Sequence, residues 1–293
     1  MHGPDRLRDA LTDRIAAQWI ALGVSLVGPP DETLIDLEAL IAATALFGRD
    51  ESRIVEGALD WCIRYGTAVS AGRLKVVAAE IDQDLTALGE FAALVAGGGG
   101  PRWPVPGRGP LVHASRGKVL VRDLRAPALL SWRLRAAFGV AARADILAVL
   151  ATSDGRAFTL AELARLVRSS KRNVSLAVRS LALADAVRVD VVGNEQRVRL
   201  TPHPGFRDWL GPTPPAFVDW TSRFSVASSV LRLDALAVPS PLVRAIDARA
   251  LVERLSPVIR RTGLPEPDTT SLGEAFGPAY DRWRDALTDV IGP

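Results

Sequence analysis

Apolar residues recur with a helical period through the first hundred residues of the chain. In the segment 6–22, Leu7, Leu11, Ile15 and Trp19 follow one another at steps of four, which places them on one face of a helix. Similar patterns, bounded by glycine and acidic residues, predict four further helices over 31–48, 50–66, 70–81 and 85–97. We therefore expect a helical N-terminal domain.

Polar residues at the start of the second predicted helix have two expected roles. Asp31 or Thr33 is placed to cap this helix, because a short side-chain oxygen can accept a free backbone N–H there. Together with Asp31, the residues Glu32, Asp36 and Glu38 form an acidic cluster, which we interpret as a solvated helix start.

Glycine and proline interrupt the helical pattern over residues 97–110. Four consecutive glycines are unfavourable inside a helix or strand, and four prolines follow within ten residues. Three more helical segments, bounded by proline and glycine, follow near the C-terminus. The sequence thus predicts a helical domain over 1–96, a linker over 97–115, a central domain over 116–202 and a helical C-terminal domain over 203–293.

The central part begins with helical patterns. Residues 128–151 are predicted to form two helices that Gly139 separates. Thr159 and Glu162 then have the spacing of a capping box, which predicts the start of a further helix. After a polar turn, another helix is predicted over 171–183.

The helix over 171–183 has two different faces. At 100° per residue, one face is apolar and is expected to pack in the core. Its residues are Val174, Val178 and Leu181. The opposite face offers hydrogen-bond donors from Arg172, Ser175 and Arg179.

A β-hairpin is predicted directly after this helix. Residues 187–192 and 196–200 alternate between apolar and polar side chains, and Gly193-Asn194 between them suits a tight turn. Arg197 and Arg199 are two residues apart and share one face of the second strand. Three helices followed by a hairpin are the plan of a winged helix-turn-helix, with the hairpin as the wing.

The same residues resemble a known family. The stretch 140–202 is similar to the winged helix of ArsR- and MarR-type bacterial transcriptional regulators. The matching positions of the recognition helix are Ser170, Val174, Ser175, Val178 and Leu181. Asp185 stands where those proteins usually have glycine. The stretches "RLRAAFGVAARADIL" and "SSKRNVSLAVRSL" also resemble bacterial winged-helix proteins associated with nucleotidyltransferase-type toxin loci.

Charge is distributed unevenly along the chain. Residues 1–100 hold 8 Lys and Arg against 15 Asp and Glu, whereas residues 117–200 hold 15 against 7. A basic central part beside an acidic one predicts a polyanionic partner for the central part.

Patterns typical of enzymes, metal sites and membrane proteins are missing from the sequence. The three histidines do not have metal-ligand spacing, and the single cysteine, Cys62, lies in an apolar run that favours core packing. No nucleophile turn occurs, and no apolar run reaches the roughly 20 residues of a membrane span. We expect a cytoplasmic protein without enzyme activity, cofactor, metal or membrane contact.

These patterns together predict a mainly α-helical, sequence-specific transcriptional regulator that represses, binds double-stranded DNA and forms a homodimer. The residues expected at base edges are Arg172, Ser175 and Arg179. Those expected at phosphates are Thr159, Ser170, Lys171, Arg197 and Arg199, and Asn173 could contact either.

Two alternatives remain open at this point. The chain could be an antitoxin or adaptor that binds a partner protein through its helical domains, with the winged helix regulating its own operon or making protein contacts. It could also be an accessory factor of nucleic-acid processing without a promoter target.

Overall fold

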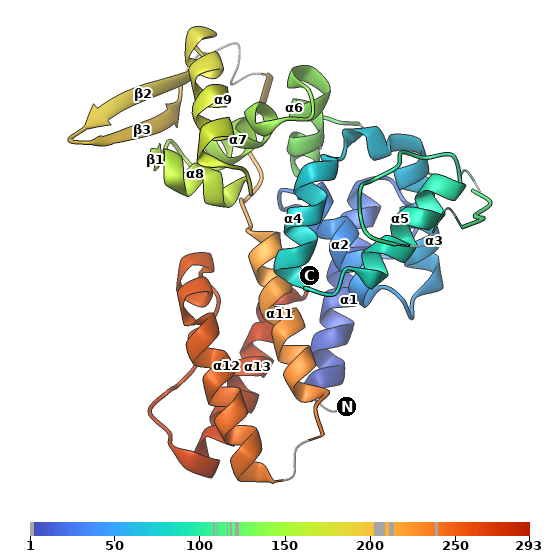
Figure 1. Cartoon of the computed structure of the whole chain (residues 1–293), viewed down its shortest axis with the longest axis vertical. Helices are drawn as coiled ribbons and strands as arrows, with labels where there is room; N and C mark the ends of the chain where they lie inside the picture. Colours follow the sequence, from blue (N-terminus) through green and yellow to red (C-terminus); the bar gives the residue numbers. More distant parts are fainter. Residues whose placement is uncertain are drawn as a thin grey trace.

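Helices from both ends of the sequence pack side by side in the computed structural model of the chain (Figure 1). The structure describes residues 3–107, 109, 111–115, 117, 119–120, 123–201, 209–210, 214–237 and 240–293. The described part is mainly helical and contains a small three-stranded antiparallel sheet. This confirms the predicted mainly α-helical class.

The elements follow the predicted order closely. The helices of the first part are α1 (Gly3–Ala21), α2 (Leu37–Phe47), α3 (Ser52–Tyr65), α4 (Ala71–Ile81) and α5 (Thr86–Gly97). The middle part contains α6 (Leu130–Phe138), α7 (Ala142–Ala151), β1 (Phe158–Thr159), α8 (Leu160–Leu166), α9 (Lys171–Leu183), β2 (Val187–Val192) and β3 (Glu195–Leu200). The last part contains α11 (Trp220–Asp234), α12 (Pro241–Thr262) and α13 (Phe276–Ile291), and single 3₁₀ turns cover Gly66–Ala68, Pro127–Leu129 and Gly273–Ala275.

One hydrophobic core joins the first and last helices of the chain. The predicted apolar face of α1, from Leu7 to Trp19, is fully buried, and α1 packs against α13. Arg14 of α1 also donates its Nε–H to the carbonyl oxygen of Ile291 at 2.9 Å. We call the unit formed by α1–α5 and α11–α13 the helical body.

The glycine-rich segment after α5 packs closely on that helix. A Cβ atom at Gly97 would lie 1.7 Å from the carbonyl oxygen of Leu111, and one at Gly89 would lie 2.1 Å from that of Pro106. Leu111 donates its N–H to the carbonyl oxygen of Ala93 at 3.0 Å. Glycine is required at these close approaches because it has no side chain. The role of 97–115 as a boundary between domains stays a prediction.

A second core lies between α6–α9 and the sheet, and we call this part the central unit. Gly139, at φ 82°, separates α6 from α7 as predicted. The strand order is β1-β3-β2, with Val198 of the middle strand opposite both Phe158 and Val189. The predicted hairpin is confirmed, and Gly193 in its turn has a positive φ of 60°.

The start of α2 differs from the prediction. Neither Asp31 nor Thr33 caps this helix, because Asp36 is its N-cap and accepts the N–H of Ala39 at 3.2 Å. Asp31 instead accepts hydrogen bonds from the guanidinium of Arg14 and from the N–H of Thr33. The helix begins at Leu37, later than the predicted residue 31, so Asp36 rather than Asp31 or Thr33 stands at its N-cap position.

Candidate nucleic-acid interface

α9 has the boundaries that the sequence predicted. Its N-cap is Ser170, whose Oγ accepts the backbone N–H of Asn173 at 3.2 Å. Val174, Val178 and Leu181 are buried, as expected for the apolar face. This face packs α9 against α7, α8 and β2, so the opposite face points away from the core of the central unit.

The opposite face of α9 carries Arg172 and Arg179, and Lys171 stands in the first turn of the helix, beside that face. Lys171, Arg172 and Arg179 are exposed, and no hydrogen bond or ion pair within the described ranges engages their side chains. Arg172 and Arg179 are two turns apart, about 10 Å along the helix axis. Cations spaced in this way on one helix face can contact a polyanionic surface.

Four other residues of α9 refine this description. Ser175 is half-buried, and Asn173 is exposed but lines a groove on the side of α9 that faces α4. Leu176 and Leu183 lie on the same face as the two arginines and are 55% and 91% exposed. These leucines were not among the predicted contact residues, although their spacing of seven residues equals that of the arginines.

α8 begins with the predicted capping box. The Oγ1 atom of Thr159 accepts the N–H of Glu162 at 3.2 Å, and the carboxylate of Glu162 accepts the N–H of Thr159 at 2.8 Å. The hydroxyl of Thr159 also donates to this carboxylate at 3.1 Å. Thr159 is therefore engaged within the chain at the position where a phosphate contact was predicted.

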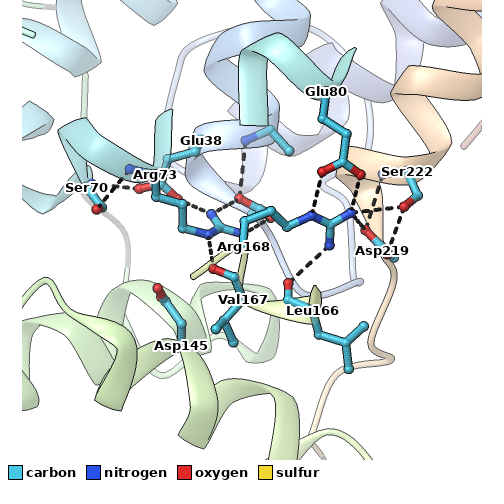
Figure 2. A network of polar contacts seen from close by, with 12 residues as sticks. Glu38, Ser70, Arg73, Glu80, Asp145, Leu166, Val167, Arg168, Asp219 and Ser222 are labelled. Atoms are coloured by element: carbon cyan, nitrogen blue, oxygen red, sulfur yellow. Dashed lines mark hydrogen bonds and ion pairs between the residues drawn. The ribbon is translucent and has the colours of Figure 1, made fainter. Parts of the chain in front are cut away.

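Arg168 fixes the turn between α8 and α9 (Figure 2). Its guanidinium donates to both carboxylate oxygens of Glu80 in α4, at 3.1 and 2.9 Å. It also lies 2.7 Å from Asp219, the N-cap of α11, and the Arg168 side chain is 5% exposed. The turn before α9 thus contacts the helical body at two helices.

Arg73 of α4 contacts the same turn (Figure 2). Its Nε–H donates to the carbonyl oxygen of Val167 at 3.1 Å, and its remaining nitrogens pair with Asp36 and Glu38. Glu38 is completely buried and accepts two further hydrogen bonds from Arg135 of α6, at 2.7 and 2.8 Å. A buried set of ion pairs therefore joins the helical body to the central unit beneath α9.

The acidic start of α2 was wrongly predicted to be solvated. Glu38 and Asp31 are buried, and Asp36 is largely covered, whereas Glu32 is exposed. The reason is that arginines far away in the sequence neutralise these carboxylates, so their burial does not leave an unpaired charge.

Burial and charge act in opposite directions on the carboxyl groups of this network. Burial by itself would raise the pKa of Glu38, but Arg135 and Arg73 outweigh burial and hold this pKa below its usual value. Arg73 in the same way lowers the pKa of Asp36 against the effect of burial. Glu38 and Asp36 are therefore ionised at neutral pH.

The arginines of the hairpin face carboxylates. The register places Asp190 opposite Arg197 and Arg188 opposite Arg199, on one face of the sheet. The Arg199 Nε atom lies 3.1 Å from Asp190, and Arg197 lies 3.5 Å from Glu195. Arg188, which was not among the predicted contact residues, also lies on this face, as the alternation in "VRVDVV" indicates. The hairpin therefore has a smaller excess of positive charge than its arginines suggest.

Asp185 makes the turn from α9 into β2. Its φ of 53° lies in the left-handed region, which glycine adopts more easily. The N–H of Asp185 donates to the carbonyl oxygen of Ala182 at 3.1 Å, and that of Ala186 donates to Leu181 at 2.9 Å. The chain therefore makes this turn without the glycine that the resemblance implied.

A groove of about 610 Å³ runs along α9 on the side of α4 and the N-terminus of α7. Val76 and Leu176 line it from two helices, and both are exposed. Arg143 of α7 adds an exposed cation that sequence reasoning did not assign to the interface. The groove thus extends the surface around Asn173 toward the helical body.

Several classes of site find no support in the described ranges. They contain no cluster of three or more His, Cys, Asp or Glu residues suited to a metal ion. None of their helices combines the length and apolar character that a membrane crossing needs. Cys62 is completely buried, and burial raises the pKa of its thiol.

Comparisons of the chain with protein-family models, curated proteins and solved structures found no match.

Proposed function

We propose that the chain is a sequence-specific, DNA-binding transcriptional regulator with a winged helix-turn-helix at its centre. The observation that carries this proposal is the exposed surface of α9, where Arg172 and Arg179 on the outer face and Lys171 in the first turn have no partner among the described residues. An α-helix fits the major groove of B-DNA, and arginine pairs with guanine there through two hydrogen bonds. Exposed, unpaired arginines on a helix fixed by its opposite face suit this role.

The order of elements in the central unit supports the proposal. The order α7, β1, α8, α9, β2, β3, with β1 paired to β3, agrees with a winged helix whose second and third helices are α8 and α9. Arg172, Ser175 and Arg179 would then face base edges. Ser170, Lys171, Arg197 and Arg199 would hold phosphates, and Asn173 could do either.

The proposal includes repression by a cytoplasmic homodimer. One winged helix reads too few base pairs to select one operator, so two copies would bind an inverted repeat. A twofold arrangement places the half-site centres about 10 bp, or a multiple of this, apart.

Selection of bound duplexes from random and genomic DNA, at stated salt, tests the proposal directly. We expect enrichment of an inverted repeat. The binding constant should fall as the salt concentration rises, and each neutralised phosphate should contribute about −0.9 to the slope of log K against log salt. The mass of the protein in solution, measured without DNA, tests the dimer separately. Absence of salt-dependent binding would reject DNA recognition.

Substitutions on α9 test the assignment of the base-reading helix. Arg172→Ala and Arg179→Ala should each weaken the preferred sequence by about 1 to 3 kcal/mol relative to random DNA. Arg260→Ala on α12 is the matched control, because Arg260 is also exposed but lies outside the central unit. Val178→Ala should reduce stability through lost core volume without changing sequence preference.

A second candidate function is docking of a partner protein, as in an antitoxin or adaptor. The observation that favours it is the exposure of Leu176 and Leu183 beside the arginines of α9. Leucine there could contact thymine methyl groups or an apolar partner surface. Leu183→Ser would distinguish these two roles. The substitution should reduce DNA sequence preference only if Leu183 contacts thymine methyl groups.

A further inference from the structure

A groove of about 580 Å³ separates the central unit from the C-terminal helices. It is lined from β1 and α8 on one side and from α11 and α12 on the other. Four arginines contribute to its wall: Arg156, Arg165, Arg223 and Arg261. Arginines thus come from both sides of the groove, at a place separate from the exposed face of α9.

The carboxylates of this groove are already engaged. Glu162 accepts the N–H of Thr159 at 2.8 Å and a hydrogen bond from Arg156 at 3.1 Å. Asp219 lies 2.7 Å from the buried Arg168 but 3.8 Å from Arg165, and it also caps α11. Neither carboxylate therefore adds a full countercharge for the remaining arginines.

Two of the arginines lack a carboxylate partner within the described part of the chain. Arg223 contacts the carbonyl oxygen of Val290 at 3.3 Å and lies over the ring of Trp220, and its buried Nε atom has no hydrogen-bond partner. Arg261 is exposed at the rim. Arg223 and Arg261 thus carry positive charges that no direct carboxylate partner in the described part neutralises, and an anion in the groove would supply this countercharge.

The effect of burial on the guanidinium groups agrees with this geometry. Burial lowers the pKa of Arg223, and the nearby Arg14 lowers it further. Burial also lowers the pKa of Arg165, and Asp219 only partly offsets the effect. Both cations are thus less stabilised by the protein than an arginine in water.

We propose that this groove binds a small phosphorylated molecule, with its phosphate held by Arg223, Arg165 and Arg261. Guanidinium groups match the oxygens of phosphate through paired, charge-assisted hydrogen bonds. Phe217 and Val218 form an apolar part of the wall that suits the organic part of such a ligand. The volume lies within the usual range for small-molecule sites, about 300 to 1,000 Å³.

Occupation of the groove would bridge α8 to α11 and α12. Because α8 precedes the turn that positions α9, the ligand would change the affinity for DNA, and this part rests on the proposed function. Coupling between two sites typically amounts to about five-fold or more in affinity.

Calorimetric titration of the intact chain with inorganic pyrophosphate, at constant ionic strength, tests the binding itself. Intrinsic tryptophan fluorescence, to which Trp220 beneath Arg223 contributes, gives a second signal. We expect saturable binding that Arg223→Gln and Arg261→Gln each weaken by about tenfold, as for loss of one charge-assisted hydrogen bond. Arg260→Gln, next to Arg261 but outside the groove, should bind like the unmodified chain.

The outcomes separate this inference from the proposed function. Absence of saturable binding, or equal binding by all variants, would overturn the site whether or not the chain binds DNA. Should Arg223→Gln fail to fold, the exposed Arg261 still allows the test. If Arg261→Gln lowers DNA affinity and its salt slope without pyrophosphate, the groove holds DNA phosphates and the small-molecule proposal is wrong. Binding of pyrophosphate without DNA binding would reject the proposed function and leave the site intact.

Discussion

The guanidinium of Arg168 holds both carboxylate oxygens of Glu80 and so joins the turn before α9 to α4. Arg168 also contacts Asp219, so a single buried side chain links the central unit to two helices of the body. The orientation of α9 on the molecule therefore depends on residues that would not contact DNA themselves.

Removal of the Arg168 side chain should weaken the contact between the central unit and the helical body. Arg168→Ala leaves Asp219 without its closest cation, and loss of one partner of a buried ion pair costs about 3 kcal/mol. Urea unfolding measures the loss of stability, and amide hydrogen exchange should increase first at the turn before α9. Arg232→Ala is the control, because its pair with Asp82 is half exposed and should be worth less than about 1 kcal/mol. Equal effects of both substitutions would contradict a special role of Arg168.

The buried carboxylate Glu38 should make stability depend on acid pH. Its folded-state pKa lies below the usual value, so its contribution is complete above the unfolded pKa and is lost as pH falls through the folded pKa. Asp36 changes in the same sense, whereas the raised pKa of Asp145 changes in the opposite sense. We expect the urea midpoint to fall as pH is lowered below about 5.

Glu38→Gln tests which group causes this pH dependence. The variant should lose about 3 to 5 kcal/mol at neutral pH, because Arg73 and Arg135 keep their burial and lose their shared partner. Its stability should also change less between neutral and acid pH than that of the unmodified chain. Glu90→Gln, in an exposed pair with Arg49, should change neither quantity appreciably. An unchanged pH profile in Glu38→Gln would show that other carboxyls dominate.

The left-handed backbone at Asp185 predicts a stabilising substitution. Asp185→Gly should raise the free energy of unfolding by up to about 1 kcal/mol, because glycine adopts this conformation without steric cost. Ala182→Gly, one turn earlier within α9, should instead lower it by about 0.5 to 1 kcal/mol. Thermal unfolding of the two variants side by side distinguishes a turn effect from a general effect of glycine.

The ion pair between Glu195 and Arg197 predicts a gain in DNA affinity. Glu195→Gln frees Arg197 and removes a negative charge from the hairpin, so binding to all sequences should strengthen alike. The log–log salt slope should become steeper by about one unit if Arg197 then contacts a phosphate. Arg197→Ala should have the reverse effect. A change limited to the preferred sequence would instead place this hairpin at base edges.

The sequence predicted those parts of the fold that follow from a local period. The apolar face of α1, the limits of α9 and the hairpin around Gly193 all follow from spacings within about twenty residues. The period of apolar residues shows which face of a helix or strand is buried. It can be recognised without knowing which other element covers that face.

The sequence did not predict contacts between distant segments. Glu38 pairs with Arg73 and Arg135, which lie 35 and 97 residues away, and no local pattern relates them. The count of Lys and Arg in the central part also overstated the positive charge available to a ligand. Arg135 and Arg168 are buried in ion pairs with carboxylates of the helical body. At the candidate interface, only tertiary packing could show that Leu183 stays exposed.

The packing of α1 against α13 has a consequence for synthesis of the chain. The core of the central unit lies almost entirely within 130–210, so its residues are all synthesised before α11–α13. The first five helices emerge earlier, yet part of their apolar surface is covered by α11–α13, which follow the central unit in the sequence. During synthesis, the helical body is therefore incomplete when all residues of the central unit have been made. We expect the apolar surface of the first five helices to stay partly uncovered until α11–α13 have been synthesised and have packed on it.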